Sequence, residues 1–254
     1  MDPEAFVAAI RGDTVLAAVM LVQNEIGSVE PVAEIGRRLR DKGASCLFHV
    51  DAVQALGKMP LSVGEIGCDT MALSGHKIHG PKGVGALYVR EGVRLGPLYG
   101  GGKQERGLRP GTENVPGCVG FGIAAELATH DLEHTVRRMT ELRDRLIQGV
   151  LACDLGATLL GPPPKGARCA TFATFAFPHI PAEVLVHALE ARGVYVSSGS
   201  ACGSRRKTRS HVLDAIHVPR HMEAIRMTLS RETLPEDVEI AVEALREAVR
   251  EIRP

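Results

Sequence analysis

The sequence lacks the features that mark membrane, secreted and nucleic-acid-binding proteins. No apolar run approaches the roughly 20 residues that a membrane-spanning helix needs. The N-terminus, Met-Asp-Pro-Glu, is acidic and has no signal-peptide pattern. The 30 basic and 30 acidic residues cancel, which argues against a nucleic-acid or anionic-membrane partner held by bulk charge. We therefore expect a cytoplasmic protein that has neither kind of partner.

The six cysteines are scattered and include no Cys-x-x-Cys pair, so neither a zinc site nor a disulfide framework is indicated. Gly, Ser and Arg surround Cys202, and no apolar periodicity would bury it. The other five are expected to be small buried hydrophobic residues: Cys46, Cys68, Cys118, Cys153 and Cys169. The sequence has no internal repeat, and its 254 residues are enough for one large or two smaller domains.

The first half of the chain predicts alternating helices and strands. Residues 3–10 are typical of a short helix with Asp2 as its N-cap. Residues 14–22 form an apolar run suited to a strand buried on both faces. Residues 31–42 have apolar positions at helical spacing, and the next strand ends at Asp51. This alternation predicts a mostly parallel sheet with right-handed crossovers.

The second half predicts a smaller α+β domain. Helical patterning covers residues 116–151, and further helices are expected at 182–191 and 236–252. Strands are expected at 169–176 and 193–197.

The stretch 70–89 is expected to carry the chemistry. It predicts a short apolar strand, a polar turn with Ser74, His76 and Lys77, a Gly/Pro-rich bend and a second apolar strand. A lysine directly against the end of a buried strand is unfavourable unless its charge is paired or removed. A Schiff base with an aldehyde cofactor removes that charge. The alternative is an ordinary solvated loop lysine.

Asp51 favours the Schiff-base interpretation. Residues 48–54 look like a buried strand that ends in a carboxylate. Pyridoxal 5'-phosphate (PLP) needs an acid against its pyridinium nitrogen, which keeps that nitrogen protonated and the ring an electron sink. Ligands of parallel α/β sheets collect at the carboxyl ends of the strands, where both Asp51 and the turn after the next strand are expected. The sequence therefore predicts a PLP site at this edge.

Six motifs occur in order along the chain. They are Asn24-Glu-Ile-Gly27, His49-Val-Asp-Ala-Val-Gln54, Ser74-Gly-His-Lys77, Arg109-Pro-Gly-Thr112, Ser198-Gly-Ser-Ala-Cys202 and Ile225-Arg-Met-Thr-Leu229. Together they resemble the PLP-dependent cysteine desulfurases, the NifS- and IscS-like members of aminotransferase class V. The resemblance runs from about residue 2 to the C-terminus.

The resemblance implies an α/β fold of the aspartate aminotransferase-like PLP-dependent transferases. Residues 1–125 would be the C-terminal part of the large PLP-binding domain, with a mostly parallel sheet. Residues 126–254 would be the linking helices and a small α+β C-terminal domain that carries the catalytic cysteine loop.

The resemblance also implies a role for each residue at the strand ends. Lys77 would carry the Schiff base and then move the substrate α-proton. Asp51 would pair with the pyridinium nitrogen, and Gln54 would bond the ring hydroxyl. Ser74 and His76 would hold phosphate oxygens.

Three residues outside that group receive roles by resemblance. Asn24 would lie near the cofactor oxygen and the substrate carboxylate. Thr112 would bond the cofactor phosphate of a partner subunit, which implies a homodimer with shared active sites. Arg226 would clamp the carboxylate of the amino acid, because a guanidinium binds it in bidentate fashion. The alternative for Arg226 is a surface ion pair with the nearby Glu223.

Cys202 is the expected nucleophile. Its thiolate, favoured by the cations Arg205, Arg206 and Lys207, would take the sulfur of L-cysteine and leave L-alanine. The resulting persulfide would pass to a sulfur-acceptor protein, a scaffold or a carrier, for iron–sulfur cluster assembly or thiolation. No metal site is expected beyond a transient ligation of an iron–sulfur cluster by Cys202.

Two alternatives remain open. The run Arg109–Asn114 also resembles selenocysteine lyase. An inactive or partner-binding fragment is the other alternative, because the family's N-terminal part supplies a Gly-x-Thr-type phosphate loop and a histidine that stacks on the pyridine ring. Neither has a counterpart in this sequence, and residue 2 already aligns in mid-domain. We therefore expect a truncated or mis-started reading frame, a split gene or a fragment.

Overall fold

The computed structural model describes residues 1–199 and 209–253. The chain divides into two compact units. Unit 1 consists of Met1–Val22 and Glu30–Leu132, and unit 2 of Gln23–Val29 and Glu133–Pro254. The short segment 23–29 thus belongs to the second unit although it interrupts the first. No helix in the described ranges is both long and apolar enough to cross a membrane.

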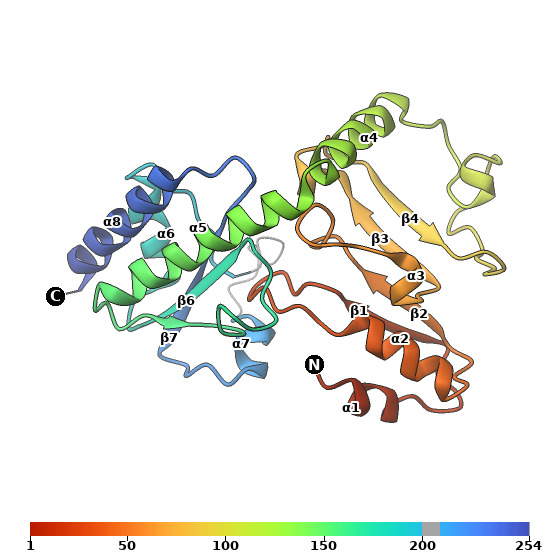
Figure 1. Cartoon of the computed structure of the whole chain (residues 1–254), viewed down its shortest axis with the longest axis horizontal. Coiled ribbons are helices and arrows are strands. Elements are labelled where there is room, and N and C mark those ends of the chain that lie inside the picture. Colours follow the sequence, from red (N-terminus) through yellow and green to blue (C-terminus); the bar gives the residue numbers. More distant parts are fainter. Residues whose placement is uncertain (200–208, 254) are drawn as a thin grey trace. The chain divides into compact units, whose positions relative to one another are not determined.

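Unit 1 contains a four-stranded sheet with the strand order β1-β2-β3-β4 (Figure 1). Strands β1 (Leu16–Met20), β2 (Leu47–Asp51) and β3 (Thr70–Ser74) are parallel. Strand β4 (Gly85–Val89) runs antiparallel to β3. The expected mostly parallel α/β sheet is therefore confirmed.

The helices of unit 1 follow the sequence pattern closely. Helix α1 (Pro3–Ala8) begins after Asp2, whose carboxylate accepts a hydrogen bond of 2.9 Å from the backbone N–H of Glu4. The N-cap prediction is confirmed. Helices α2 (Val32–Asp41) and α3 (Val63–Ile66) lie on the crossovers from β1 to β2 and from β2 to β3.

The carboxyl ends of the parallel strands meet at one edge of this sheet. In the strand register Asp51 pairs with Met20 on one side and with Ala72 on the other. A 3-10 helix, η1 (Gly75–Ile78), follows β3 without a connecting loop. Its Ile78 packs in a small cluster with buried alanines of α4 (Val115–Thr129). This packing fixes the turn that carries Lys77.

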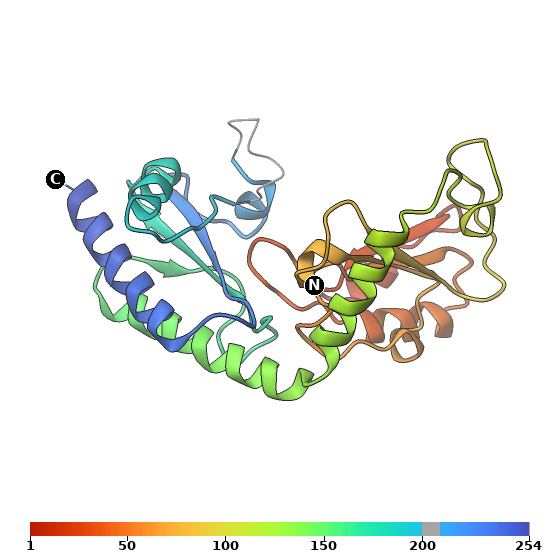
Figure 2. The ribbon, with the colours of Figure 1, turned by 90° about the horizontal axis from the view of Figure 1, so that it is seen from above.

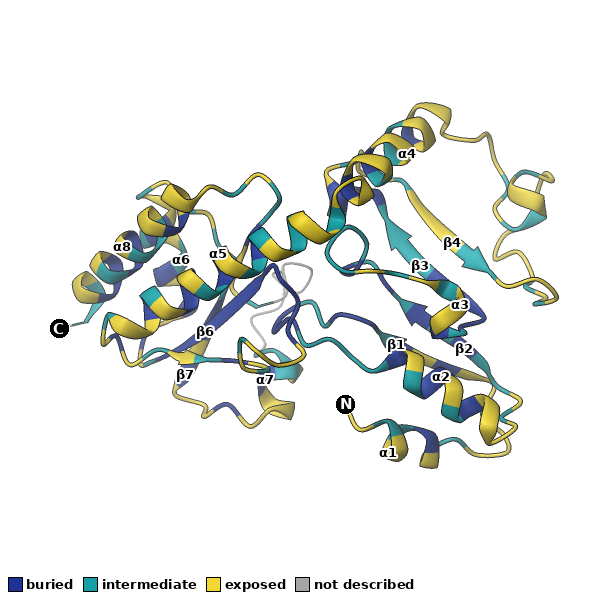
Figure 3. Ribbon diagram, in the orientation of Figure 1, coloured by how far each residue is buried: buried dark blue, intermediate teal, exposed yellow. Residues whose placement is uncertain are grey.

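The prediction that residues 14–22 are buried on both faces is wrong. Strand β1 carries both buried and exposed residues (Figure 3). Ala17 and Val19 are buried, whereas Leu16, the first residue of the strand, is 53% exposed. The strand therefore alternates, with one face in the core and one face in solvent. An apolar run alone does not reveal which of its faces a second layer covers.

Unit 2 is built on a three-stranded antiparallel sheet with the order β5-β6-β7. Its strands are β5 (Thr158–Leu159), β6 (Phe172–Pro178) and β7 (Met222–Thr228). Its helices are α5 (Leu132–Ala152), α6 (Ala182–Glu190), α7 (His211–Ala215) and α8 (Pro235–Ile252). Two views show α8 running alongside α5 (Figures 1 and 2). The expected small α+β domain is confirmed.

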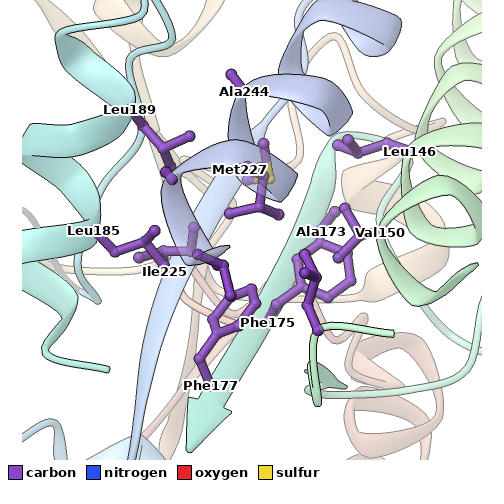
Figure 4. Close-up of a cluster of buried hydrophobic side chains, with 14 of the residues drawn as sticks. Leu146, Val150, Ala173, Phe175, Phe177, Leu185, Leu189, Ile225, Met227 and Ala244 are labelled. Carbon is purple, nitrogen blue, oxygen red and sulfur yellow. The ribbon is translucent and has the colours of Figure 1, made fainter. Parts of the chain in front are cut away.

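The main core of unit 2 lies between one face of the sheet and three helices. Phe175 and Phe177 of β6 and Ile225 of β7 meet side chains of α5, α6 and α8 there (Figure 4). The opposite face of the sheet packs in a second cluster that includes Ile26 from the segment 23–29 and Leu213 of α7. The sheet is thus covered on both faces, which explains why β6 is apolar apart from Thr174.

The strand expected at 193–197 is wrong. Within the described residues this stretch contributes only one isolated bridge, between Ser197 and Arg226. Two backbone hydrogen bonds form the bridge: Arg226 N–H to the Ser197 carbonyl (2.7 Å) and the reciprocal bond (3.2 Å). The contact nevertheless places residue 197 beside the middle of β7.

Candidate functional site

The first group of site residues lies at the carboxyl edge of the sheet of unit 1. Asp51 is the last residue of β2, and its carboxylate accepts a hydrogen bond of 2.9 Å from the N–H of Val53. This bond turns the chain away from the strand and leaves the half-buried carboxylate at the sheet edge. Gln54 is only 7% exposed, and its Oε1 accepts from Lys58 Nζ at 2.9 Å. The two side chains are therefore held by local bonds before any ligand binds.

The turn after β3 brings three further site residues to the same edge. Ser74 ends the strand, and its Oγ shares a hydrogen bond of 2.8 Å with Nδ1 of His76. Lys77 is half-buried on η1. His79, whose φ is +65°, ends η1 in the left-handed conformation and turns the chain toward β4. The structure thus places Ser74, His76 and Lys77 on one rigid turn.

The donor set of these residues fits PLP. A half-buried carboxylate suits a protonated ring nitrogen, and a half-buried amine suits an aldehyde. A hydroxyl bonded to an imidazole presents two groups that can donate to phosphate oxygens. These groups come from the carboxyl ends of two adjacent parallel strands, where this sheet type binds its ligands.

Thr112 lies apart from this group. It is exposed, in the loop between β4 and α4 that also contains the short 3-10 helix η2 (Glu105–Gly107). In that loop, Gln104 Oε1 accepts from the N–H of Gly111 at 3.2 Å. Among the described residues, no hydrogen bond or ion pair joins Thr112 to the strand ends. Its role as a phosphate ligand stays a prediction.

The second group of site residues lies in unit 2, on the turn formed by residues 23–29. Gln23 Oε1 accepts two hydrogen bonds of 2.7 Å each, from the N–H groups of Glu25 and Ile26. Gly27 has a φ of +70°, and a β-carbon there would lie 2.4 Å from Cβ of Phe172. Only glycine fits this conformation and this close approach to β6. The local sequence therefore dictates a tight turn against the sheet.

Two cross-strand partners hold this turn on the face of the sheet. Thr174 of β6 pairs with Arg226 of β7 in the register, so both side chains lie on the same face. Thr174 Oγ1 donates to the carbonyl of Glu25 at 2.5 Å, and Arg226 Nη1 donates to the carbonyl of Asn24 at 2.7 Å. The structure therefore brings Asn24 and Arg226 together, and their roles at the substrate carboxylate stay predictions.

Glu223, the carboxylate expected in the alternative ion pair, forms a different contact. It accepts a hydrogen bond of 2.7 Å from the N–H of Ala182 at the start of α6. Glu223 and Arg226 are three residues apart on one strand, so their side chains point to opposite faces. The surface ion pair between them is excluded by this geometry.

The buried guanidinium of Arg168 also holds this turn in place, through hydrogen bonds to backbone carbonyls. Arg168 is 6% exposed and donates to the carbonyls of Pro162 (2.6 Å), Phe172 (3.2 Å) and Ile26 (3.3 Å), and also to that of Leu160. Burial, with a smaller effect of the Arg143 cation, lowers the pKa of Arg168 to about 10. The group stays charged at neutral pH and holds these carbonyls together.

Replacing Arg168 by methionine is expected to lower the free energy of unfolding by about 3–5 kcal/mol, because several buried carbonyls lose a charged donor. The measurement is a urea titration followed by circular dichroism. Arg145→Met is the matched control, since Arg145 forms an exposed pair with Glu239, and should change the free energy by about 0–1 kcal/mol. Equal effects of the two substitutions would contradict the role assigned to Arg168.

The cysteines differ in exposure. Cys68 and Cys169 are buried, and burial raises the pKa of the Cys68 thiol. Cys46 and Cys153 are half-buried, and Cys118 is exposed on α4, so the prediction of five buried cysteines is wrong for Cys118. Most residues of α4 are apolar, and several of these apolar residues are exposed, so the sequence pattern does not reveal that Cys118 lies on an exposed side of the helix. Cys202 lies outside the described residues.

Sequence reasoning assigned no role to Glu25. The structure buries this residue, and its Oε2 accepts a hydrogen bond of 2.7 Å from Ser210 Oγ. The two partners are 185 residues apart, so no local pattern could reveal the contact. The sequence feature that could have pointed to Glu25 is an acidic residue within a tight turn, where its side chain cannot rotate freely into solvent.

The sequence model of the family described as Aminotransferase class-V matches residues 1–240. Two curated relatives are a cysteine desulfurase IscS from Methanosarcina thermophila and a cysteine desulfurase from Bradyrhizobium diazoefficiens. They are 44% and 46% identical to this chain over 255 residues, and the alignments cover all of it. The same alignments cover 62% and 64% of the two relatives, so the chain spans less than two thirds of their length.

Two solved structures are also similar to this chain, which again covers only part of their length. A NifS-like protein matches with a TM-score of 0.89 and 36% identity over 99% of this chain and 65% of that one. A structure described as SspA in complex with cysteine matches with a TM-score of 0.71 and 30% identity, over 92% of this chain and 64% of that one.

Proposed function

Because the chain belongs to the class-V aminotransferase family, we propose that it works as a PLP-dependent cysteine desulfurase, which converts L-cysteine into L-alanine and a persulfide on Cys202. The observation that carries this proposal is the position of Asp51 and Lys77, on half-buried sites at the carboxyl ends of adjacent parallel strands. The names of the curated relatives support the choice of substrate.

The residues of unit 1 would hold the cofactor. Lys77 would bind its aldehyde through Nζ, and Asp51 would pair with its protonated ring nitrogen. Because Gln54 Oε1 is bonded to Lys58, the amide nitrogen is the group left to donate to the ring oxygen. Ser74 and His76 would donate to the phosphate. Bound PLP supplies an electron sink for charge that develops on the substrate.

The residues of unit 2 would bind and cleave the substrate. Arg226, fixed by its bond to the Asn24 carbonyl, would bind the amino-acid carboxylate, with the Asn24 side chain beside it. Lys77 Nζ would move the α-proton. The Cys202 thiolate would then attack the substrate sulfur, so that an S–S bond forms as the C–S bond breaks. A proton replaces sulfur on the carbon, which balances the reaction without an external oxidant.

The proposal extends to partners. The persulfide on Cys202 would pass to a sulfur-acceptor protein, a scaffold or a carrier, in iron–sulfur cluster assembly or thiolation. A homodimer would bring Thr112 to the phosphate held in a second copy. Sulfur transfer to an acceptor protein and formation of a homodimer both fit a cytoplasmic protein.

The test measures alanine formation from cysteine together with the mass of the peptide that contains Cys202. We expect alanine to form and the wild-type peptide to gain one sulfur atom, and Cys202→Ala to lose both signals. The reaction is run with the chain alone and with a second polypeptide that matches the part of the relatives beyond this chain. No alanine in either mixture would refute the proposal, and selenocysteine turnover that survives Cys202→Ala would indicate a lyase instead.

A further inference from the structure

We propose that Gln23 and Thr174 are positioning residues that orient the Arg226 guanidinium toward the substrate carboxylate. The inference rests on the proposed function, in which Arg226 binds that carboxylate. Gln23 and Thr174 act through two successive peptide groups of the turn formed by residues 23–29. The first of these peptide groups presents the Asn24 carbonyl to Arg226.

The side chain of Gln23 fixes the N–H edges of the two peptide groups. Its Oε1 accepts hydrogen bonds from the N–H of Glu25 and from the N–H of Ile26, at 2.7 Å each. Its Nε2 donates to Oδ1 of Asn24 at 3.4 Å. One side-chain amide therefore holds two successive peptide groups and also the side chain of Asn24.

Two donors from the sheet of unit 2 fix the opposite edges of the same peptide groups. Arg226 Nη1 donates to the Asn24 carbonyl at 2.7 Å, and Thr174 Oγ1 donates to the Glu25 carbonyl at 2.5 Å. A peptide group is planar, so hydrogen bonds at both of its edges fix its orientation. The turn therefore presents the Asn24 carbonyl to Arg226 in one fixed direction.

The hydroxyl of Thr174 lies in a buried and apolar place. Thr174 is 2% exposed and belongs to β6, the central strand of its sheet, where Phe172 and Ala176 are its neighbours on the same face. A buried hydroxyl is unfavourable unless it is hydrogen-bonded. The bond to the Glu25 carbonyl offsets this cost, and a valine of nearly the same shape could not form it.

The register of the sheet couples the turn to the orientation of Arg226. Thr174 and Arg226 are cross-strand neighbours on one face, and they donate to consecutive carbonyls of the turn. The backbone of Arg226 is fixed as well, by its bridge to Ser197. Because the guanidinium is planar, fixing its Nη1 restricts its rotation. A substrate carboxylate then meets a group that is already oriented, which lowers the entropic cost of binding.

The first test follows the Arg226 guanidinium by NMR in the full chain, without cofactor or substrate. Rotation about its Nε–Cζ bond requires the hydrogen bond from Nη1 to the Asn24 carbonyl to break. We expect Thr174→Val to speed this rotation about three- to tenfold, which is the factor that one ordinary hydrogen bond contributes. Thr174→Ser keeps the hydroxyl and should match the wild type. The loss of the signal in Arg226→Lys identifies it.

Thr171→Val is the matched control, because Thr171 is also buried, at 1% exposed, but its Oγ1 contacts Sγ of Cys169 at 3.5 Å. It should leave the rotation of Arg226 unchanged. Gln23→Leu removes the acceptor of both N–H groups and should act like Thr174→Val. This variant keeps the test valid if substitution at Thr174 prevents folding, which the thermal midpoint reports.

The second test measures whether the effect reaches the substrate. In whichever mixture forms alanine from cysteine, Thr174→Val should raise the KM for cysteine about three- to tenfold and keep kcat within about twofold. Added to Arg226→Ala, Thr174→Val should lower kcat/KM no further, because both residues act through one contact. A merely structural role of Thr174 would lower kcat/KM in both backgrounds.

Equal rotation of the guanidinium in the wild type, Thr174→Val and Gln23→Leu would overturn the proposal. An undiminished effect of Thr174→Val in the Arg226→Ala background would also overturn it. If no mixture forms alanine, the proposed desulfurase function fails, but the rotation rates still decide whether Gln23 and Thr174 position Arg226.

Discussion

Lys77→Ala is expected to reduce cysteine turnover by about 10³-fold or more, because it removes both the amine that binds the aldehyde and the group that moves the α-proton. Lys77 is half-buried on η1, directly after β3, so no other amine on this turn replaces it. The measurement is alanine formation from cysteine in the presence of PLP, with the visible absorbance of the bound cofactor as a second signal.

Lys82→Ala is the matched control, since Lys82 lies five residues further along the same connection but is exposed. It should retain turnover and absorbance. Borohydride treatment of the loaded wild-type protein should leave a pyridoxyl label on the peptide that contains Lys77. A label on another lysine, or none, would contradict the assignment of the site in unit 1.

Arg226→Ala is expected to lower kcat/KM for cysteine by about 10²–10³-fold, because two charge-assisted hydrogen bonds to the substrate carboxylate are lost. Arg226→Lys keeps the charge but presents a single point donor, so it cannot bond the Asn24 carbonyl and grip a carboxylate in bidentate fashion at once. We expect it to recover less than a tenth of the lost activity. Steady-state kinetics with cysteine are the measurement.

Arg231→Ala provides the comparison for a nearby arginine of the same motif region. Its guanidinium pairs with the adjacent Glu232 at 2.9 Å, and a half-exposed neighbour pair of this kind contributes little. Its kinetics should therefore match the wild type. A loss of activity in Arg231→Ala comparable to that in Arg226→Ala would contradict the assignment of Arg226 as the residue that binds the substrate carboxylate.

The strand ends could be predicted from the sequence because their signals are local. Asp51 and Ser74–Lys77 each follow an apolar run that is too short for a helix, and parallel strands must bring such ends to one edge. The helix beginning after Asp2 was predictable for the same reason, since its cap and first turn are adjacent in sequence. These features need no knowledge of distant partners.

Features that depend on distant partners could not be predicted. Strand β7 contains Glu223 and Arg226 among apolar residues, and its place beside β6 follows from pairing across about 50 residues of sequence. Residues 193–197 have the composition of a strand but make only one bridge. The Glu25–Ser210 bond joins positions that no periodicity relates.

The position of residues 23–29 has a consequence for the order in which the protein is made. The partners of this turn, Arg168, Thr174 and Arg226, leave the ribosome long after the turn itself. Chains fold domain by domain as they emerge, so the nascent turn must remain unengaged until Arg226 has left the exit tunnel. A polypeptide cut between the two units at residue 132 would therefore deprive the C-terminal piece of a part it cannot make for itself.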